Sequence, residues 1–140
     1  MKILLAADGS KYTRRAVDYL IRHSELFGAE PELHLLHVQP PLPARAASAL
    51  SRASVQRYYH DQSEKALGAP RRALAARRVA FKEATLLGDP AQSIASYATK
   101  GRFSLIIMGS RGLGTLGGLV LGSVASKVLA NCRVPALIIR

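Results

Sequence analysis

The sequence predicts an α/β protein whose parallel sheet of five strands is covered by helices on both faces. Two observations support this fold class. Short apolar runs bounded by turn residues alternate along the 140 residues with longer segments of helical periodicity. Several runs are apolar at nearly every position, which is typical of strands buried on both faces of a parallel sheet. Strands and helices that alternate in this way are joined by right-handed crossovers.

The first third of the chain predicts a strand, a helix and a second strand. The first strand is expected over residues 2–7, where the apolar run ends at Asp8. Ser10 is a candidate N-cap for a helix over residues 11–27, in which apolar residues recur at spacings of three and four. The second strand is expected over residues 33–38.

The middle of the chain predicts a long helical region, a strand and a further helix. The helical region is expected over residues 46–78, after a proline-rich turn that excludes an immediate helix. Gly68–Pro70 predicts a break or kink in it. The third strand is expected over residues 79–87. Asp89 as N-cap and Pro90 at the first helical position start the next helix.

The last third contains a glycine-rich loop between two strands. The fourth strand is expected over residues 105–108, and six glycines occur over residues 109–122 that follow. A short helix is expected from Ser123 to about residue 131, and the last strand over residues 134–139.

The glycine loop follows the frame Gly-x2-Gly-x9-Gly-Ser from Gly109 to Ser123. Parallel sheets bind ligands at the carboxyl ends of their strands, and both this loop and the Asp8 turn lie there. Glycine lets backbone N–H groups approach a phosphate closely, and the helix that follows adds its positive end. The spacing matches neither a Walker P-loop nor the dinucleotide fingerprint. A simple flexible connection is the alternative interpretation.

Six segments together resemble a known family: residues 3–10, 37–38, 88–90, 107–112, 121–124 and 134–135. Because of these segments, the whole chain resembles the universal stress protein family, whose ATP-binding branch carries the same glycine frame. The resemblance implies one universal stress protein domain over residues 1–140. It also implies a Rossmann-like (adenine nucleotide alpha hydrolase-like) three-layer sandwich with strand order 3-2-1-4-5.

The resemblance further implies an ATP site with Mg or Mn held mainly by the phosphates. The ends of the first two strands would meet adenine and ribose, and the glycine loop with the next helix would surround the phosphates. Relatives often carry a hydroxyl residue where this chain has Ala125, so one contact to a phosphate or a water would be missing here. Helix capping is the simpler role for Ser10. The implied nucleotide-binding residues are Ala7, Asp8, Ser10, Val38, Met108, Gly109, Arg111, Gly112, Gly122, Ser123, Val124 and Ala125.

No catalytic residue and no metal-binding residue are predicted. Asp8 is the only carboxylate expected at the site, and nucleotide recognition is its simpler role. His34 and His37 lie three apart on a strand and therefore point to opposite faces. His23 and His60 are expected at the surface. We expect ATP to serve as a bound signal in a stress-response regulatory module, with slow or no hydrolysis. A slow ATPase or nucleotidyl-transfer enzyme is the alternative.

The chain carries 20 Lys plus Arg against 9 Asp plus Glu, a net charge of +11. Basic residues crowd positions 45–82, where a solvated helix face is the simplest interpretation and an acidic protein partner the next. No nucleic-acid-binding module accompanies them, so nucleic acid is not expected. A protein with an empty loop that works through this basic surface is a third hypothesis.

The last strand would form an edge of the sheet, and an exposed apolar edge invites pairing with a second copy. The family resemblance points the same way, and a homodimer through Ala136–Ile139 is expected. No apolar run reaches the roughly 18 residues that a membrane span needs. Asp8 ends the first apolar run before the length of a signal-peptide core, so a cytoplasmic location is expected.

Overall fold

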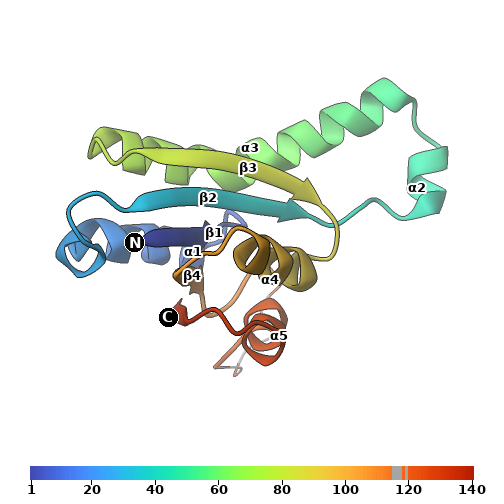
Figure 1. Cartoon of the computed structure of the whole chain (residues 1–140). Coiled ribbons are helices and arrows are strands. Elements are labelled where there is room, and N and C mark those ends of the chain that lie inside the picture. The colour runs from blue at the N-terminus through green and yellow to red at the C-terminus, as the bar shows by residue number, and fades with distance from the viewer. Residues whose placement is uncertain (115–117, 119) are drawn as a thin grey trace.

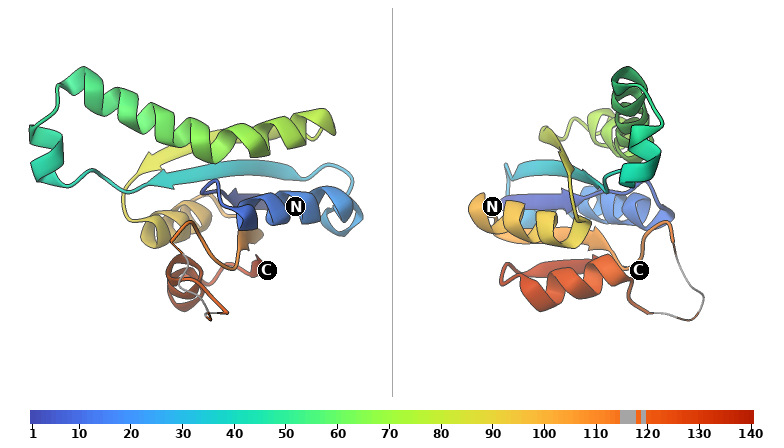
Figure 2. Two further views of the ribbon diagram at one scale, coloured as in Figure 1. Left: turned by 180° about the vertical axis from the view of Figure 1, so that it is seen from behind. Right: turned by 90° about the vertical axis from the view of Figure 1, so that its right-hand side faces the viewer.

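The computed structural model describes residues 1–114, 118 and 120–140, and it contains a parallel sheet between two layers of helices (Figures 1 and 2). The strand order is β3-β2-β1-β4-β5, and all pairs are parallel, as predicted. The arrangement is the expected Rossmann-like three-layer sandwich. The elements are β1 (Lys2–Ala6), α1 (Lys11–Arg22), η1 (Ser24–Phe27), β2 (Glu32–Gln39), α2 (Ala44–Ser48), α3 (Arg52–Ala76), β3 (Phe81–Leu87), α4 (Pro90–Lys100), β4 (Leu105–Gly109), α5 (Ser123–Asn131) and β5 (Ala136–Ile139).

Two apolar clusters, one on each face of the sheet, form the core. Alternate residues of each inner strand serve opposite faces, as the pleat requires. On β1, Leu5 packs with α1 and α3, whereas Leu4 packs with α4 and α5. Residues of β1 from Ile3 to Leu5 are fully buried, which explains the continuous apolar run in the sequence. His34 and His37 lie on opposite faces, as predicted, with His34 beside Phe103 and His37 beside Ala7.

The predicted helix over residues 11–27 is shorter than expected. α1 ends at Arg22, and the chain tightens into the 3-10 helix η1, which buries Phe27. His23 lies at the junction, where its Nδ1 contacts the Tyr19 carbonyl oxygen at 3.0 Å and its ring stacks on Tyr19. His23 is therefore half-buried rather than at the surface, whereas His60 is exposed as predicted.

The helical region over residues 46–78 is broken at a different place from the one predicted. The break lies between α2 and α3, where the Ser51 hydroxyl caps α3 by accepting from Ser54 N at 3.1 Å. α3 continues through Gly68–Pro70 without ending. Pro70 is buried with Leu67 and Leu74, and this packing outweighs the missing backbone hydrogen bond.

α2 and the first half of α3 project beyond the carboxyl end of β2 (Figures 1 and 2). We call residues 40–61 the arm. Strand limits otherwise differ from the prediction by one or two residues: β3 begins at Phe81 and β5 at Ala136.

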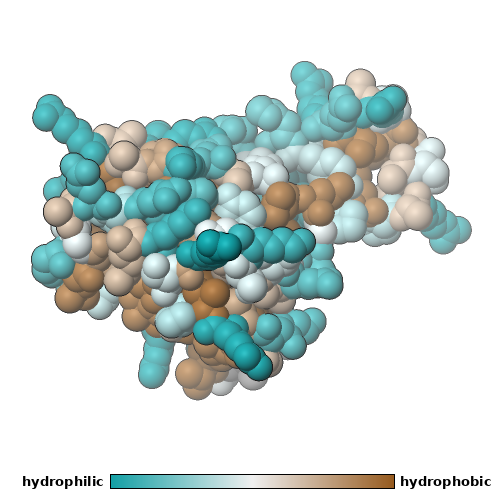
Figure 3. Space-filling model, viewed as in Figure 1, coloured by the Kyte–Doolittle hydropathy of each residue, from teal (hydrophilic) through white to brown (hydrophobic). Residues whose placement is uncertain are grey.

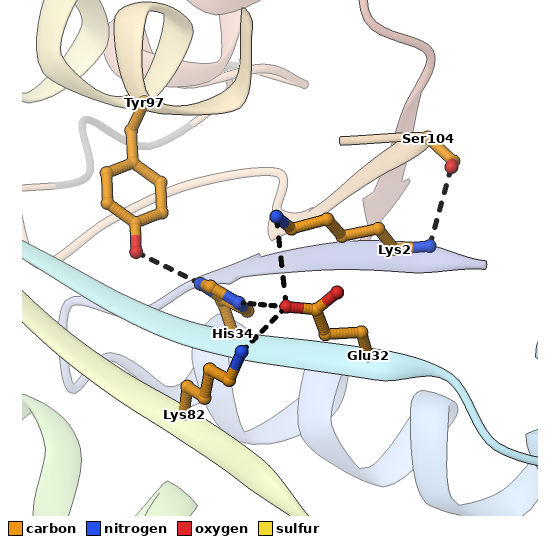
Figure 4. Close-up of polar contacts among 6 residues, drawn as sticks. All are labelled: Lys2, Glu32, His34, Lys82, Tyr97 and Ser104. Atoms are coloured by element: carbon orange, nitrogen blue, oxygen red, sulfur yellow. Dashed lines mark hydrogen bonds and ion pairs between the residues drawn. The ribbon is translucent and has the colours of Figure 1, made fainter. Parts of the chain in front are cut away.

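A polar network ties three strands to α4 on the edge near the N-terminus (Figure 4). Glu32 accepts from Lys82 Nζ at 2.9 Å and contacts His34 Nε2 at 3.1 Å. Lys2 Nζ lies 3.8 Å from the same carboxylate, and His34 Nδ1 meets the Tyr97 hydroxyl at 3.0 Å. These contacts, led by Lys82 and then His34, lower the pKa of Glu32 to about 2.

The face shown in Figure 3 is mostly hydrophilic, with smaller apolar areas on the arm and between the charged side chains. None of the helices in the described part of the chain has both the length and the apolar character to cross a membrane.

Candidate functional site

A cleft of about 600 Å³ opens at the carboxyl ends of β1, β2 and β4. Its volume is typical of small-molecule sites, and this edge is where doubly wound sheets bind ligands. The sequence-predicted site residues that line it are Ala7, Asp8, Val38, Met108, Gly109, Arg111, Gly112, Gly122, Ser123, Val124 and Ala125. Ser10 is the one predicted residue outside the lining; it is buried, and its hydroxyl caps α1 by accepting from Thr13 N at 3.3 Å.

Asp8 is held rigidly at the end of β1. Its Oδ1 accepts from Ser10 N and from the Thr13 hydroxyl, each at 2.8 Å. Thr13 Oγ1 in turn accepts from Asp8 N at 3.0 Å. Since Oδ1 is occupied by these bonds, Oδ2 is the oxygen left to meet a ligand, and a Cβ placed on Gly112 would come within 2.7 Å of it.

Three glycines of the predicted frame have separate structural reasons to be glycine. A Cβ on Gly112 would fill the space beside Asp8 Oδ2. A Cβ on Gly122 would lie 3.1 Å from the Arg111 Cα, where the loop folds back and Gly122 N donates to Ser110 O. Gly109 is required for packing, because its Cβ would approach that of Tyr12 to 2.5 Å. Thr115, Leu116, Gly117 and Leu119, inside the same frame, lie outside the described residues.

The N-terminus of α5 faces the cleft with its first turn. Gly122 is the N-cap residue and has no side chain to bond the first amides, which have no partner within the helix. Ser123 occupies the first helical position, and its side chain does not cap the helix. Ser123, Val124 and Ala125 all line the cleft, so this uncapped positive helix end borders it.

Arg111 brings an incompletely bonded cation to the cleft. Its Nη1 donates to the Tyr12 hydroxyl at 3.3 Å, and the guanidinium lies over the Tyr12 ring at 5.8 Å. Its Nε is buried and hydrogen-bonds to no atom of the described residues. A buried donor without a partner is unfavourable, and an anion in the cleft could satisfy it.

Sequence reasoning missed a second group of lining residues from α1, β2, α3 and α4. His37 lines the cleft, with Nδ1 2.9 Å from Ala7 O and Nε2 3.1 Å from Gln39 Oε1. Gln39 and Pro40 could have been inferred from the carboxyl-end rule, because Gln39 ends β2 and Pro40 directly follows it. No sequence signal marks the α3 contribution. The main members of this group are Thr13, His37, Gln39, Pro40, Gln62, Lys65, Pro90 and Ile94.

The charged side chains of the cleft are few. Within the described lining, Asp8 is the only carboxylate, and Lys65 and Arg111 are the cations. In that same part of the chain, no group of three or more His, Cys, Asp or Glu side chains could hold a metal ion. The lining thus suits a ligand with an apolar part and an anionic part.

A sequence model of the Universal stress protein family matches residues 1–140. The "Universal stress protein in QAH/OAS sulfhydrylase 3′region" of Thermus aquaticus is 34% identical over 139 residues, which are 99% of this chain and 97% of that protein.

Solved structures are similar over the same length. The hypothetical protein MJ0577 has a TM-score of 0.77 at 26% identity, over 99% of this chain and 94% of its own. A universal stress protein family protein from Arabidopsis thaliana, solved with AMP bound, has a TM-score of 0.69 at 19% identity, over 99% and 90%. At that identity the second likeness concerns the fold.

Proposed function

This chain belongs to the universal stress protein family, and we propose that it binds ATP in the cleft as a nucleotide-dependent regulatory module. The observation that carries the proposal is the pairing of two features across one cleft. On one side, Asp8 keeps Oδ2 available beside Gly112. On the other side, donors for an anion come from the first turn of α5, whose N-cap is a glycine, and from Arg111 Nε, which has no hydrogen-bond partner among the described residues.

In this proposal the two ends of the cleft bind different parts of the nucleotide. Val38 and Met108 are buried apolar residues that would pack on the adenine, and Asp8 Oδ2 would accept from the ribose or base. The phosphates would meet Arg111 and the first amides of α5. A Mg²⁺ or Mn²⁺ ion would be held mainly by the phosphates. The AMP in the Arabidopsis thaliana structure supports the choice of an adenine nucleotide.

Slow or absent hydrolysis is part of the proposal. Phosphoryl transfer to water needs a positioned water and strong stabilisation of the transferring group. Asp8 is the one carboxylate in the described lining, and one of its oxygens already accepts hydrogen bonds from Ser10 and Thr13. Steady release of phosphate that depends on Mg²⁺ and on Asp8 would instead support the ATPase alternative.

The test begins with freshly purified protein, which is denatured so that any released nucleotide can be identified by mass spectrometry. Calorimetric titration of ATP-Mg into stripped protein then compares the wild type with Gly122→Leu. The substitution should abolish binding, because its Cβ would press on the Arg111 backbone. Circular dichroism establishes that the variant is folded. Wild-type protein that releases no nucleotide and gives no heat with ATP would overturn the proposal.

A homodimer through β5 is the second part of the proposal. β5 lies at the edge of the sheet, and its four residues are apolar and only partly buried. Light scattering at micromolar concentration should give twice the 15.0 kDa mass of the chain. A single-chain mass at that concentration would contradict the dimer and leave the nucleotide proposal untouched.

A further inference from the structure

Both roots of the arm border the cleft. The chain leaves β2 through Gln39 and Pro40 and returns through Gln62 and Lys65 of α3, and all four residues line the cleft. The arm between them, residues 40–61, projects away from the sheet at this same edge (Figure 2). A molecule in the cleft would therefore contact the arm where it departs and where it returns.

The arm buries no residue between its roots. From Gln39 to Lys65, all of which the structure describes, every residue is exposed or half-buried. Burial begins at once after Lys65, with Ala66 and Leu67 at 2% and 1% exposure. A segment with so little buried apolar surface is one whose position a small free energy can change.

The arm is nevertheless tied together within itself. The Tyr59 hydroxyl accepts from Leu42 N at 2.9 Å, joining the outgoing chain to α3. Tyr58 and Tyr59 meet edge to face, with ring centroids 5.7 Å apart. These few contacts are what a local opening of the arm would break, and amide exchange along the arm reports that opening.

Lys65 stands at the point where the arm joins the site. Its main chain packs against the turn after Asp8, because a Cβ on Gly9 would come within 2.9 Å of Lys65 O. Its side chain forms no ion pair with any carboxylate in the part of the chain that the structure describes. The neighbouring Glu64 is occupied by Arg71 through two hydrogen bonds of 3.0 Å. Lys65 is thus available to an anion in the cleft.

We propose that Lys65 binds the phosphates of the nucleotide and thereby makes the position of the arm depend on whether the cleft is occupied. The proposal rests on the nucleotide-binding function proposed above. A ligand shifts a conformational equilibrium only if it interacts differently with the two states. The nucleotide would contact Lys65 and Pro40 only while the two ends of the arm stay beside the cleft. These contacts therefore favour that position of the arm over one in which its ends move away. The arm carries exposed Arg45, Arg52 and Arg57, so its position decides which basic surface is displayed.

Amide hydrogen exchange measured by mass spectrometry tests the proposal on the full chain. Wild-type protein, Lys65→Met and the control Arg72→Met are compared without ligand, with adenosine and with saturating ATP-Mg. Arg72 is exposed on the same helix and does not line the cleft. ATP should slow exchange across residues 40–61 several-fold in wild type and in the control. Adenosine, which has no phosphate, should protect the arm less.

Lys65→Met should bind ATP about ten-fold more weakly by calorimetry and should lose the protection of the arm even at saturation. Equal ATP affinity in Lys65→Met and wild type, or an arm whose exchange ATP leaves unchanged, would overturn the inference while the ATP site stands. Wild-type protein that gives no heat with ATP would overturn the proposed function itself, and calorimetry separates the two failures. If Lys65→Met does not fold, Lys65→Gln, which also removes the charge, takes its place with the same expected and overturning results.

Discussion

Asp8 Oδ2 lies so close to Gly112 that a Cβ at that position would come within 2.7 Å of the oxygen. The carboxylate cannot turn away easily, because Ser10 N and the Thr13 hydroxyl both hold Oδ1 at 2.8 Å. Gly112 therefore keeps open the one oxygen of Asp8 that a ligand can use. Gly114, two residues later in the same loop, has nothing within 4 Å of an added Cβ.

Gly112→Ala is accordingly expected to weaken ATP binding by about ten-fold, which is about 1.4 kcal/mol, whereas Gly114→Ala leaves it near the wild-type value. Both substitutions remove a glycine from the same loop, so a general loss of loop freedom would affect them alike. Calorimetric titration of each variant with ATP-Mg measures the difference. Similar affinities for the two variants would show that the space beside Asp8 is not used by the ligand.

Arg111→Met should weaken ATP binding by roughly 10- to 100-fold, because a charge-assisted hydrogen bond contributes about 1.5–3 kcal/mol. Adenosine binding should change far less, since the effect acts through the phosphates. Arg15→Met is the matched control: its guanidinium also lies over the Tyr12 ring, at 5.4 Å, but it does not line the cleft. An equal loss for ATP and adenosine would indicate a structural role for Arg111 instead.

Thr13→Val should lower both the stability and the ligand affinity. Thr13 is 3% exposed, and its hydroxyl both accepts from Asp8 N and donates to Asp8 Oδ1. Valine would leave a partly buried amide and a carboxylate oxygen without these bonds, at a loss of about 1–3 kcal/mol of unfolding free energy. Urea denaturation measures the loss, and Thr13→Ser, which keeps the hydroxyl, should recover most of it. Failure of serine to restore stability would assign the effect to the lost methyl group.

The part of the site that could be predicted is the part that is local in sequence or fixed by topology. Asp8 and Gly112 follow apolar runs that had to be inner parallel strands, and the carboxyl ends of such strands share one edge. Lys65 could not be placed in this way. Its position depends on how closely α3 approaches the turn at Gly9, and helical periodicity carries no information on that distance.

The errors in the fold have the same origin. Gly68–Pro70 predicts a break or a kink; the break does not occur, because buried residues of α3 on both sides of Pro70 carry the helix through it. His23 was expected at the surface because it has no partner in the sequence, but it stacks on Tyr19 one helical turn earlier. In both cases side-chain packing decides the structure, although the sequence correctly shows the weaker local preference of proline to end a helix and of histidine to be exposed.

The network around Glu32 predicts a dependence of stability on pH that Glu32→Gln should remove (Figure 4). Hydrogen bonds from Lys82 and His34 lower the pKa of Glu32 from an ordinary value of 4.5 to about 2 in the folded protein. A carboxylate whose pKa is lower in the folded than in the unfolded state stabilises the fold fully above the unfolded value, and the contribution is lost as the pH falls from about 4.5 through about 2.

Denaturant unfolding at a series of pH values should therefore show that the free energy of unfolding of Glu32→Gln declines less steeply in acid than that of wild type. Glu25→Gln, at an exposed position outside this network, is the control. NMR titration of the Glu32 carboxyl should place its midpoint near 2, and a midpoint near 4.5 would show that the network does not hold the charge.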